Sequence, residues 1–366
     1  MKKSINELSN DEVINEIKRS IQYLLGDSCY TEIRALDVLP THKTASGYFT
    51  NLEELSAAAA DLTLRSKGVY FLPNPLHIEA RDGRHKYGIS EPAFKTTNDS
   101  EIDRREWLLI DADPIRPSGV SSTDAELEAA MAKVRCIRED LRQLEWPEPV
   151  IATSGNGGHL MYRVDLPADD GGLVQRVLQA LALRYDDEVV QVDTSVYNPA
   201  RIWKLYGTIA RKGANTTERP HRQARTLWDE SPESIQVVPQ KKLEALAAPI
   251  QSLNLQHLPS TSPRFDLDAW IRDHQLNVTG PRPWNGGQGR KWIFRVCPWN
   301  SEHTDRSAYI AQLPGGAIAA GCHHNGCQGK GWRELRDMIE PGWQEKRNQF
   351  AFTDLGNAER LVHRPP

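Results

Sequence analysis

The sequence predicts an α+β fold with a mixed sheet, followed by a small second domain. Strand-like apolar runs alternate irregularly with helical segments through the first 235 residues. Prolines then recur from residue 232 to residue 263, which is typical of a linker. The residues after this stretch are rich in Gly, Trp, Cys and His. We therefore expect a first domain at 1–235, a linker at 236–263, a second domain at 264–345 and a tail at 346–366.

Hydrophobic periodicity and capping signals place the elements of the first domain in order. Helices are expected at residues 9–25, 51–66, 171–185 and after a capping box formed by Thr123 and Glu126. The first two begin at Ser9 or Asn10 and at Asn51. Strands are expected at residues 68–76, 107–111, 149–153, 159–166 and 188–196. A short helix at residues 241–248 is expected within the linker.

Charge and hydropathy exclude several classes of protein. The net charge of −4 and the pI of about 6.3 do not favour nucleic-acid binding, so such a function would depend on a local basic patch. Residues 201–225 form one, with seven basic residues against the single acid Glu218. No apolar run approaches the roughly 20 residues that span a bilayer, and the N-terminus lacks the apolar core of a signal peptide. We expect a cytoplasmic protein without a membrane partner.

Two acids end a buried strand in the segment "IDADP". Asp111 and Asp113 are two residues apart, so on a strand they face the same side. Two like charges this close repel each other unless a cation lies between them. A hard divalent ion, Mg²⁺ or Mn²⁺, prefers such carboxylate oxygens. An ordinary strand exit remains the alternative, because Asp is common at this position.

Two further segments offer groups that suit phosphate. The turn "SGNGG" is followed by His159, and its successive amides could line an anion site, although a simple hairpin turn explains it equally well. Asp193 ends another apolar strand, and Arg201 and Lys204 follow it three residues apart, on one helical face if residues 198–204 form a turn of helix. Together, three acids could hold two metal ions while the turn, His159, Arg201 and Lys204 hold a triphosphate.

The order of "IDADP", "SGNGGHL" and "VDTSVYNPARIWKLYGT" resembles the three motifs of the archaeo-eukaryotic primase superfamily, specifically phage- and plasmid-encoded primase-polymerases. The resemblance covers residues 30–230. The DxD motif of the family matches Asp111 and Asp113, its small-Gly-x-Gly-x-His motif matches residues 154–159, and its later acidic motif matches Asp193. It implies a primase-polymerase core with an RRM-like half, which extends strands on a single-stranded DNA template from NTPs or dNTPs.

The resemblance also implies roles for single residues. The ligands of the catalytic Mg²⁺ or Mn²⁺ would be Asp111, Asp113 and Asp193. The nucleotide phosphates would be held by Ser154, Gly155, Asn156, Gly157, His159, Arg201 and Lys204. The nucleic acid would be contacted by Arg211, Lys212, Arg219 and Arg222, an assignment that depends on charge more than on the motif. Sugar or base could be touched by Tyr48, Tyr70, Phe71 and Asn74, but a place in the core is favoured for the three aromatic residues.

A cluster of cysteines and histidines marks the second domain. Cys297 and His303 precede an expected hairpin at residues 306–321, whose turn is Pro314-Gly315-Gly316, and Cys322 and Cys327 follow it. Because a hairpin brings the two pairs together, we expect a structural Zn²⁺ site. His324 could replace His303. The cluster resembles zinc modules that accompany primase cores. Nearby tryptophans could stack on bases, but a role in the core is favoured; they are Trp284, Trp292, Trp299 and Trp332.

The segment "TDLGNAERLV" near the end of the sequence resembles the segment that precedes a superfamily 3 helicase in phage primase-helicases. We therefore expect either the N-terminal part of a primase-helicase, with a helicase domain or partner, or a naturally separate primase. The sequence favours a DNA primase-polymerase. The alternatives are a non-catalytic DNA-binding module of a replication initiator and a metal-dependent nuclease.

Overall fold

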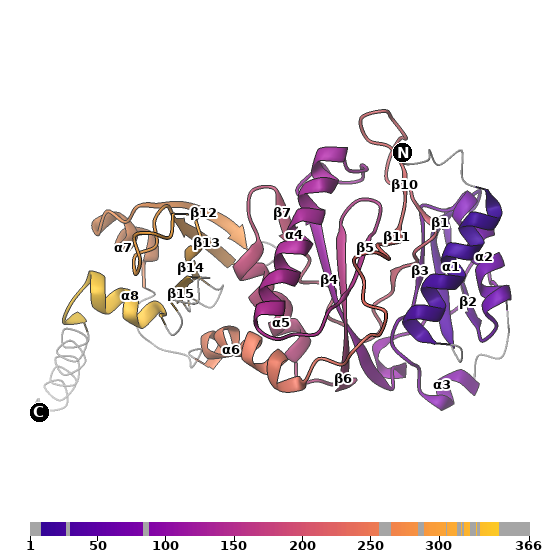
Figure 1. Cartoon of the computed structure of the whole chain (residues 1–366), viewed down its shortest axis with the longest axis horizontal. Helices are drawn as coiled ribbons and strands as arrows, with labels where there is room; N and C mark the ends of the chain where they lie inside the picture. The colour runs from indigo at the N-terminus through magenta and orange to yellow at the C-terminus, as the bar shows by residue number, and fades with distance from the viewer. Residues whose placement is uncertain are drawn as a thin grey trace, which may run out of the picture. The chain divides into compact units, whose positions relative to one another are not determined.

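The chain divides into two compact units, Met1–Ile250 and Gln251–Pro366, which are described separately (Figure 1). The computed structural model describes residues 9–26, 30–82, 88–255, 265–284, 289–304, 306–312, 316, 318–322, 327 and 330–343. The tail at 346–366 and the turn residues Pro314 and Gly315 lie outside these ranges. Within these ranges, each helix is too short or too polar to cross a bilayer.

The first sheet of the N-terminal unit has the strand order β2-β1-β3-β8. Its strands are β1 (Thr31–Val38), β2 (Lys43–Phe49), β3 (Gly68–Phe71) and β8 (Trp203–Lys204). Helix α2 (Leu52–Arg65) packs against β1 and β3, and α1 (Asn10–Leu25) packs against α2. Both helices begin where the sequence predicts, at the capping residues Ser9 and Asn51. The short α3 (Ile78–Asp82) and a 3₁₀ turn at Asp99–Glu101 follow.

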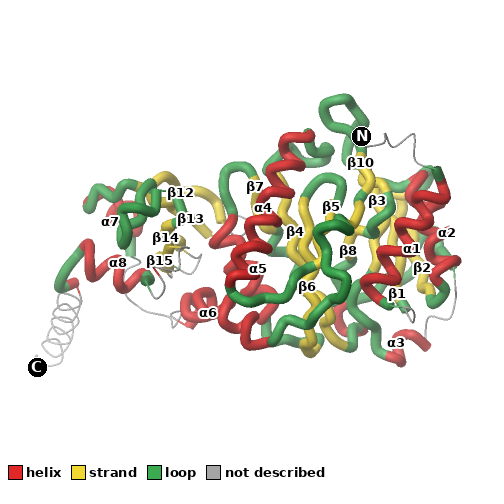
Figure 2. The backbone as a smooth tube through the Cα atoms, in the orientation of Figure 1, coloured by secondary structure: helices red, strands yellow, loops and turns green. Residues whose placement is uncertain are grey.

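The second sheet of this unit has the strand order β11-β5-β6-β4-β7. Its strands are β4 (Arg104–Pro114), β5 (Val150–Thr153), β6 (Gly158–Pro167), β7 (Val190–Val192) and β11 (Arg225–Thr226). Helices α4 (Asp124–Gln143) and α5 (Leu173–Tyr185) lie together on one face of it (Figures 1 and 2). The predicted capping box of Thr123 and Glu126 opens α4. A short pair, β9 (Ile209–Ala210) and β10 (Arg222–Gln223), stands beside the sheet.

The prediction of a mixed sheet is wrong. Neighbouring strands are antiparallel in each of the four sheets formed by the described residues. The crossover through α4 does make β4 and β5 parallel, as a strand-helix-strand pattern suggests. However, β6 lies between them and pairs antiparallel with both. Periodicity along the chain cannot reveal that a later hairpin strand inserts into the sheet.

One hydrophobic core joins the two sheets of the N-terminal unit. As predicted, Phe71 and Tyr48 are buried, with exposed fractions of 0% and 7%. Asn74 is buried too, and its Oδ1 accepts a hydrogen bond from the backbone N–H of Glu106 at 2.8 Å, which ties the end of β3 to β4. Helix α6 (Gln240–Leu255) adds Leu243 to this core.

The C-terminal unit is a four-stranded antiparallel sheet with two short helices. Its elements are α7 (Leu267–Asp273), β12 (Val278–Trp284), β13 (Gly289–Phe294), β14 (Ala308–Gln312), β15 (Ile318–Cys322) and α8 (Trp332–Ile339). The predicted hairpin is the pair β14 and β15. The prediction that the tryptophans build the core is confirmed. Trp284 and Trp292 are buried, and Trp299 and Trp332 pack against the core.

Candidate functional site

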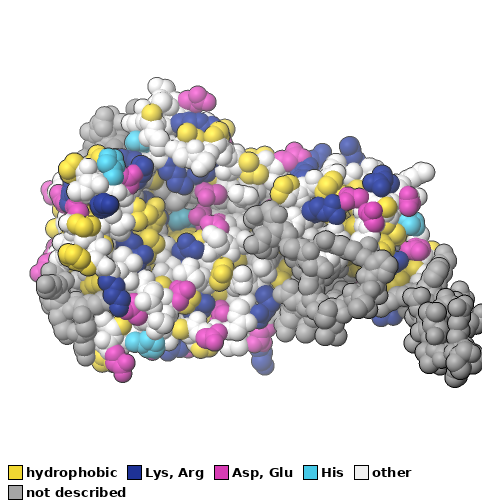
Figure 3. Space-filling view, turned by 180° about the vertical axis from the view of Figure 1, so that it is seen from behind, with side chains coloured by type: hydrophobic (Ala, Val, Ile, Leu, Met, Phe, Trp, Pro, Cys, Tyr) yellow, Lys and Arg dark blue, Asp and Glu magenta, His cyan; other side chains and the backbone are white. Residues whose placement is uncertain are grey.

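The register of the five-stranded sheet brings three of the predicted site residues together. Asp111 on β4 lies directly opposite His159 on β6. On its other side, the backbone N–H of Asp193 donates to the carbonyl oxygen of Asp111 at 2.8 Å. Because opposed residues of antiparallel strands share a face, Asp111 and His159 point to the same side of the sheet. Figure 3 shows acidic and histidine side chains close together in the middle of the N-terminal unit, with Lys and Arg around them.

The glycine turn lies against both carboxylates of the Asp111 and Asp113 pair. A Cβ atom on Gly157 would lie 2.8 Å from Asp113 Oδ1 and 3.4 Å from Asp111 Oδ1. Both carboxylates therefore point to the same side, as expected for residues two apart on a strand. The same Cβ would lie 2.8 Å from the carbonyl oxygen of Ala112. Any side chain at position 157 would consequently displace either strand β4 or the two acids.

The setting of Asp111 makes its negative charge costly. Its Oδ1 atom is buried and has no hydrogen-bond partner among the described residues. Burial raises the pKa of Asp111 well above its ordinary value, and the carboxylates of Asp113 and Asp193 raise it further, while Lys212 and Arg116 lower it. Carboxylate oxygens are the ligands that hard divalent cations prefer. Asp111 and Asp113, whose carboxylates face the same side and include a buried oxygen without a partner among the described residues, therefore fit Mg²⁺ or Mn²⁺, with Asp193 near enough to raise the pKa of Asp111.

His159 is a buried, neutral imidazole. Its side chain is 2% exposed, and burial, together with the charge of Lys204, lowers its pKa to about 3. The ring stacks on Trp203 with 4.0 Å between ring centroids. Its Nδ1 atom lies 3.0 Å from the hydroxyl of Tyr206, and its Nε2 atom lies 3.5 Å from Asp111 Oδ1. The imidazole edge that carries Nε2 thus faces the carboxylates.

The amides of the glycine turn are bonded within the turn itself. The hydroxyl of Ser154 accepts hydrogen bonds from the backbone N–H groups of Asn156 at 3.3 Å and Gly157 at 2.9 Å. The hydroxyl of Thr153 accepts from the N–H of Gly155 at 3.0 Å. These hydroxyls fix the shape of the turn, so the turn positions its neighbours more than it offers free amides to an anion.

Residues 198–204 do not form the turn of helix in which Arg201 and Lys204 would share a face. Lys204 lies in strand β8, which pairs with β3, and Arg201 precedes it in a run of turns. Strand pairing overrides the local helical spacing here. Arg201 Nη2 donates to the carbonyl oxygen of Ser195, and its Nε is buried without a hydrogen-bond partner among the described residues.

The ammonium group of Lys204 is used inside the protein. It donates to the carbonyl oxygens of Ile209 at 3.1 Å and Val69 at 3.4 Å, and it lies 5.3 Å from the centroid of the Tyr70 ring. Burial lowers the pKa of Lys204 to about 7. Burial and the nearby carboxylates of Asp111 and Asp113 raise the pKa of Tyr70, so this ring lies near the acids as well as near Lys204.

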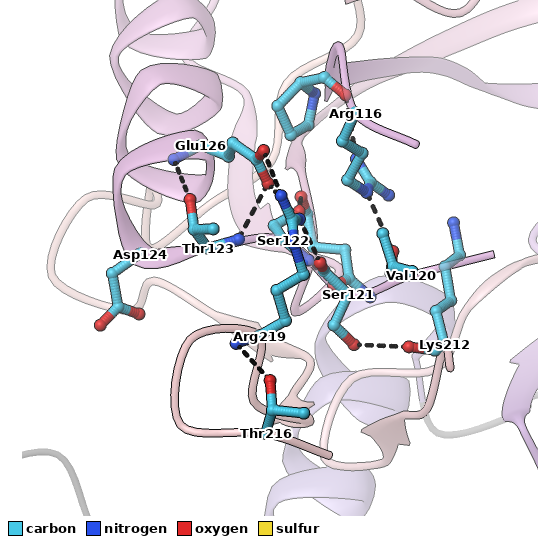
Figure 4. Close-up of polar contacts among 12 residues, drawn as sticks. Arg116, Val120, Ser121, Ser122, Thr123, Asp124, Glu126, Lys212, Thr216 and Arg219 are labelled. Carbon is cyan, nitrogen blue, oxygen red and sulfur yellow. Dashed lines mark hydrogen bonds and ion pairs between the residues drawn. The ribbon is translucent and has the colours of Figure 1, made fainter. Parts of the chain in front are cut away.

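Two of the four basic residues assigned to nucleic acid bind the start of helix α4, and Figure 4 shows the contacts of one of them, Arg219. Arg219 forms a bidentate ion pair with Glu126, at 2.8 and 2.9 Å. Arg222 donates to the carbonyl oxygen of Ser122 and to Asp124 Oδ1, both at 2.7 Å. These guanidinium groups fasten the segment around residues 211–222 to the N-terminus of α4.

The other two basic residues differ from each other. Arg211 Nη1 donates to the carbonyl oxygens of Thr63 and Ser66 at the end of α2. The carbonyl oxygen of Lys212 accepts a hydrogen bond from the hydroxyl of Ser121 at 3.1 Å, which fixes its backbone. The side chain of Lys212 is exposed, has no hydrogen-bond partner among the described residues, and lies near enough to Asp111 to lower its pKa. Of the four, Lys212 alone presents a free charge to the acids.

Sequence reasoning missed Arg116. Its Nη1 atom lies 3.5 Å from Asp113 Oδ1 and 3.1 Å from the carbonyl oxygen of Pro114, and its Nε donates to the carbonyl oxygen of Val120 at 3.2 Å. The side chain is 8% exposed. Its position three residues after Asp113 was the one available signal, because loops that follow a strand exit often carry site residues.

The C-terminal unit contains a group of four residues that could hold a metal such as zinc. The ligand atoms of Cys297, His303, Cys322 and Cys327 lie within 4.8 Å of one another. His303 Nδ1 lies 3.6 Å from Cys322 Sγ and 3.5 Å from Cys327 Sγ. The alternative ligand His324 lies outside the described residues.

The chemistry of this group fits zinc. Burial, with the neighbouring thiols of Cys297 and Cys322, raises the pKa of the Cys327 thiol to about 12. Three thiols so close together ionise only beside a cation, and a bound metal ion deprotonates a coordinating thiol. Soft sulfur ligands with one imidazole in a set of four are typical of structural Zn²⁺.

Comparison with known proteins finds little. No protein-family model matches the sequence, and no curated protein matches it. Among solved structures, the chain is similar to the crystal structure of primase RepB′, with 14% identity and a TM-score of 0.38 over 67% of this chain and 65% of that chain. It is also similar to the catalytic domain of primase RepB′ in complex with initiator DNA, with 13% identity and a TM-score of 0.36 over 68% of this chain and all of that one. Likenesses this weak carry no argument about function.

Proposed function

We propose that the chain is a DNA primase-polymerase, a nucleotidyltransferase that joins nucleotides on a single-stranded DNA template. The observation that carries this proposal is the grouping of Asp111, Asp113 and Asp193 beside the neutral His159. Three carboxylates that include an unpartnered buried oxygen favour divalent cations. Such cations suit phosphoryl transfer, in which the protein chiefly positions and neutralises the reacting phosphate.

In the proposed reaction, the 3′-hydroxyl oxygen of a primer or first nucleotide attacks the α-phosphorus of a nucleoside triphosphate. A new phosphorus–oxygen bond forms, the bond to the bridging oxygen between the α- and β-phosphates breaks, pyrophosphate leaves, and the hydroxyl proton passes to a water molecule. Mg²⁺ or Mn²⁺ held by the three acids would neutralise the charge that develops on the phosphate. Neutral His159 offers a hydrogen bond to a phosphate oxygen from beside Asp111.

The basic residues divide between two roles in this proposal. Lys212, with its exposed and unpaired side chain, contacts the phosphates of the nucleotide next to the acids. Arg116 orients Asp113 from a distance of 3.5 Å. Arg219 and Arg222 hold the start of α4 in place through their ion pairs with Glu126 and Asp124. Because these charges are paired, we expect them to contribute less than Lys212 to binding the template.

The C-terminal unit has a separate role in the proposal. A Zn²⁺ ion held by the four-residue group would support a small domain that contacts the template, and the later part of the predicted linker, after Ile250, would link the two domains.

An incorporation assay tests the proposed function. The purified chain should add labelled nucleotides to a primer, or form one, on single-stranded DNA with Mg²⁺ or Mn²⁺. Asp111→Ala and Asp113→Ala should abolish the product without loss of folding, whereas Lys241→Ala, an exposed change in α6, should not. If the wild type bound DNA tightly but incorporated no nucleotide, a non-catalytic module of a replication initiator would be favoured over a primase-polymerase. Degradation of DNA without nucleotides would favour a nuclease. Parallel assays with NTPs and dNTPs would identify the sugar.

A further inference from the structure

Tyr206 occupies the centre of a buried hydrogen-bond chain behind His159. Its hydroxyl oxygen lies 2.8 Å from Trp203 Nε1, 3.0 Å from His159 Nδ1 and 3.5 Å from Met161 Sδ. The side chain of Tyr206 is fully buried, as are those of the residues it contacts. We therefore assign the protons of this network from the donor and acceptor chemistry of the protein groups themselves.

The protons of this chain can be assigned by their chemistry. The indole N–H of Trp203 is only a donor, so the oxygen of Tyr206 accepts from it. Tyr206 then has one proton to donate, either to the imidazole nitrogen Nδ1 of His159 or to the thioether sulfur of Met161. A thioether sulfur is a weak acceptor, whereas the imidazole nitrogen Nδ1, 3.0 Å away, is a much stronger one. The hydroxyl of Tyr206 therefore donates to His159.

This direction fixes the other edge of the imidazole ring. A buried histidine favours the neutral form, which has a single N–H group. If Nδ1 accepts from Tyr206, that N–H is on Nε2, which faces Asp111 Oδ1 at 3.5 Å. The opposite tautomer would aim a lone pair of Nε2 at a carboxylate and leave the tyrosine proton to sulfur. At 3.5 Å the contact with Asp111 is too long to satisfy the N–H group.

We propose that Tyr206 is a positioning residue that fixes His159 as the Nε2–H tautomer, so that His159 donates a hydrogen bond to an anionic phosphate oxygen beside the acids and is not a metal ligand. This inference rests on the proposed function for the identity of the anion as a nucleoside triphosphate. The tautomer itself does not depend on that function. A nitrogen that carries a proton cannot coordinate a metal ion, so the two roles exclude each other.

The first test observes the protons directly. The full chain is labelled with ¹⁵N-histidine, and the imidazole nitrogens of His159 are recorded by NMR in the presence of Mg²⁺, with His159→Gln to assign them among the 11 histidines. We expect a protonated Nε2 and an unprotonated Nδ1. A proton on Nδ1 would overturn the proposal whether or not the chain polymerises nucleotides. The expected tautomer in a protein without nucleotide incorporation would instead leave the proposal standing and reject the proposed function.

The second test separates positioning from structural support. Tyr206→Phe removes the hydroxyl, and we expect the KM for nucleotide to rise about tenfold, the size of one hydrogen bond to a charged group. His159→Gln keeps a donor amide near the place of Nε2 and has no tautomers. In the His159→Gln background, Tyr206→Phe should therefore change the KM by less than about twofold, since the two effects are coupled. If Tyr206→Phe raised the KM equally with His159 and with glutamine at position 159, Tyr206 would act through packing alone. That result would contradict its positioning role.

Discussion

Asp111 lies at the centre of the candidate site, in surroundings that disfavour its charged form. Its side chain is 19% exposed, but the Oδ1 atom is buried without a hydrogen-bond partner among the described residues, and two other acids are close by. Because the pKa of Asp111 is raised in the folded protein, its contribution to stability is fully present below the unfolded pKa and is lost as the pH rises through the folded pKa. Near neutral pH the charged form therefore destabilises a protein without bound cations.

Asp111→Asn should consequently stabilise the metal-free protein while abolishing its activity. Each unit of pKa shift is worth about 1.4 kcal/mol, so we expect the free energy of unfolding at pH 7 in EDTA to rise on the order of 1 kcal/mol. The gain should shrink toward pH 4, and stabilisation by Mg²⁺ should be lost. Denaturant unfolding at several pH values measures this, with the exposed Asp229→Asn as control. A less stable variant would contradict the electrostatic account.

At the scale of residues, the sequence could indicate the acids as candidate site residues because each of them stands at the end of an apolar strand. Asp111, Asp113 and Asp193 end apolar strands, and His159 follows a glycine turn, so a short window contains the signal. No short segment of the sequence gives a comparable signal for Tyr206 or Arg116. Tyr206 reaches His159 from 47 residues away in the sequence, and only the fold brings them together.

At the scale of elements, the start of α4 shows what charge alone does not reveal about the basic stretch. The capping box of Thr123 and Glu126 was predictable from four residues. That Glu126 also receives Arg219, 93 residues later, was not. A run of basic residues suggests a nucleic-acid surface as long as the partners of its side chains are unknown. Here three of the four arginine and lysine side chains assigned to nucleic acid have partners in the protein.

Arg219→Ala should therefore act on stability more than on DNA. Loss of the bidentate pair with Glu126 should lower the free energy of unfolding, since two charge-assisted hydrogen bonds at the start of α4 are lost. The slope of log K for DNA against log salt should change little, whereas a lost phosphate contact would reduce it by about 0.7 to 0.9. Salt titrations of DNA affinity measure the slope, with Lys212→Ala as the contrasting variant. A reduced slope for Arg219→Ala would restore its predicted role.

The strands β1 and β2 show another limit of sequence patterns. Glu32 on β1 is fully buried, where it accepts bonds from Arg34 at 2.8 and 2.9 Å and from Ser46 at 2.6 Å. A charged residue in the middle of a buried strand breaks the alternation that predicts strands. Its partners lie on β1 itself and on β2, so the signal exists only after the strands have paired.

The Cys/His group should control the folding of the C-terminal unit independently of the first. Cys322→Ser should remove one Zn²⁺ per chain and unfold residues 265–343, because structural zinc contributes folding energy directly. Cys136→Ser is the matched control, since Cys136 is exposed and lies in the N-terminal unit. Metal analysis and limited proteolysis measure the two effects. Retained zinc in Cys322→Ser would remove this cysteine from the ligand set.

At the scale of the whole molecule, the first compact unit ends within α6, at Ile250, and Leu243 and Ala247 of this helix belong to its core although they lie in a proline-rich stretch. Composition indicates a linker there, but composition does not report what a helix packs against. Leu243 has no exposed surface. The change of composition and the change of compact unit therefore occur at different places along the chain.

Leu243→Ala should destabilise the N-terminal unit strongly. Truncation of a buried leucine costs about 2–5 kcal/mol, and Lys241→Ala, two residues away and exposed, should cost less than about 0.5 kcal/mol. Denaturant unfolding followed by tryptophan fluorescence measures both variants. Similar small effects for the two would mean that α6 does not contribute to the core in solution.

The alignment of Asp111 with its neighbours on β6 and β7 also limits how this protein can diverge in evolution. A single inserted residue in β4 ahead of Asp111 would turn its side chain to the opposite face, since faces alternate along a strand. The exposed residues 213–218 carry no such constraint, because a change of loop length there leaves the register of the sheet intact. Lineages of this protein should therefore keep the spacing of their strand residues while their loops lengthen and shorten.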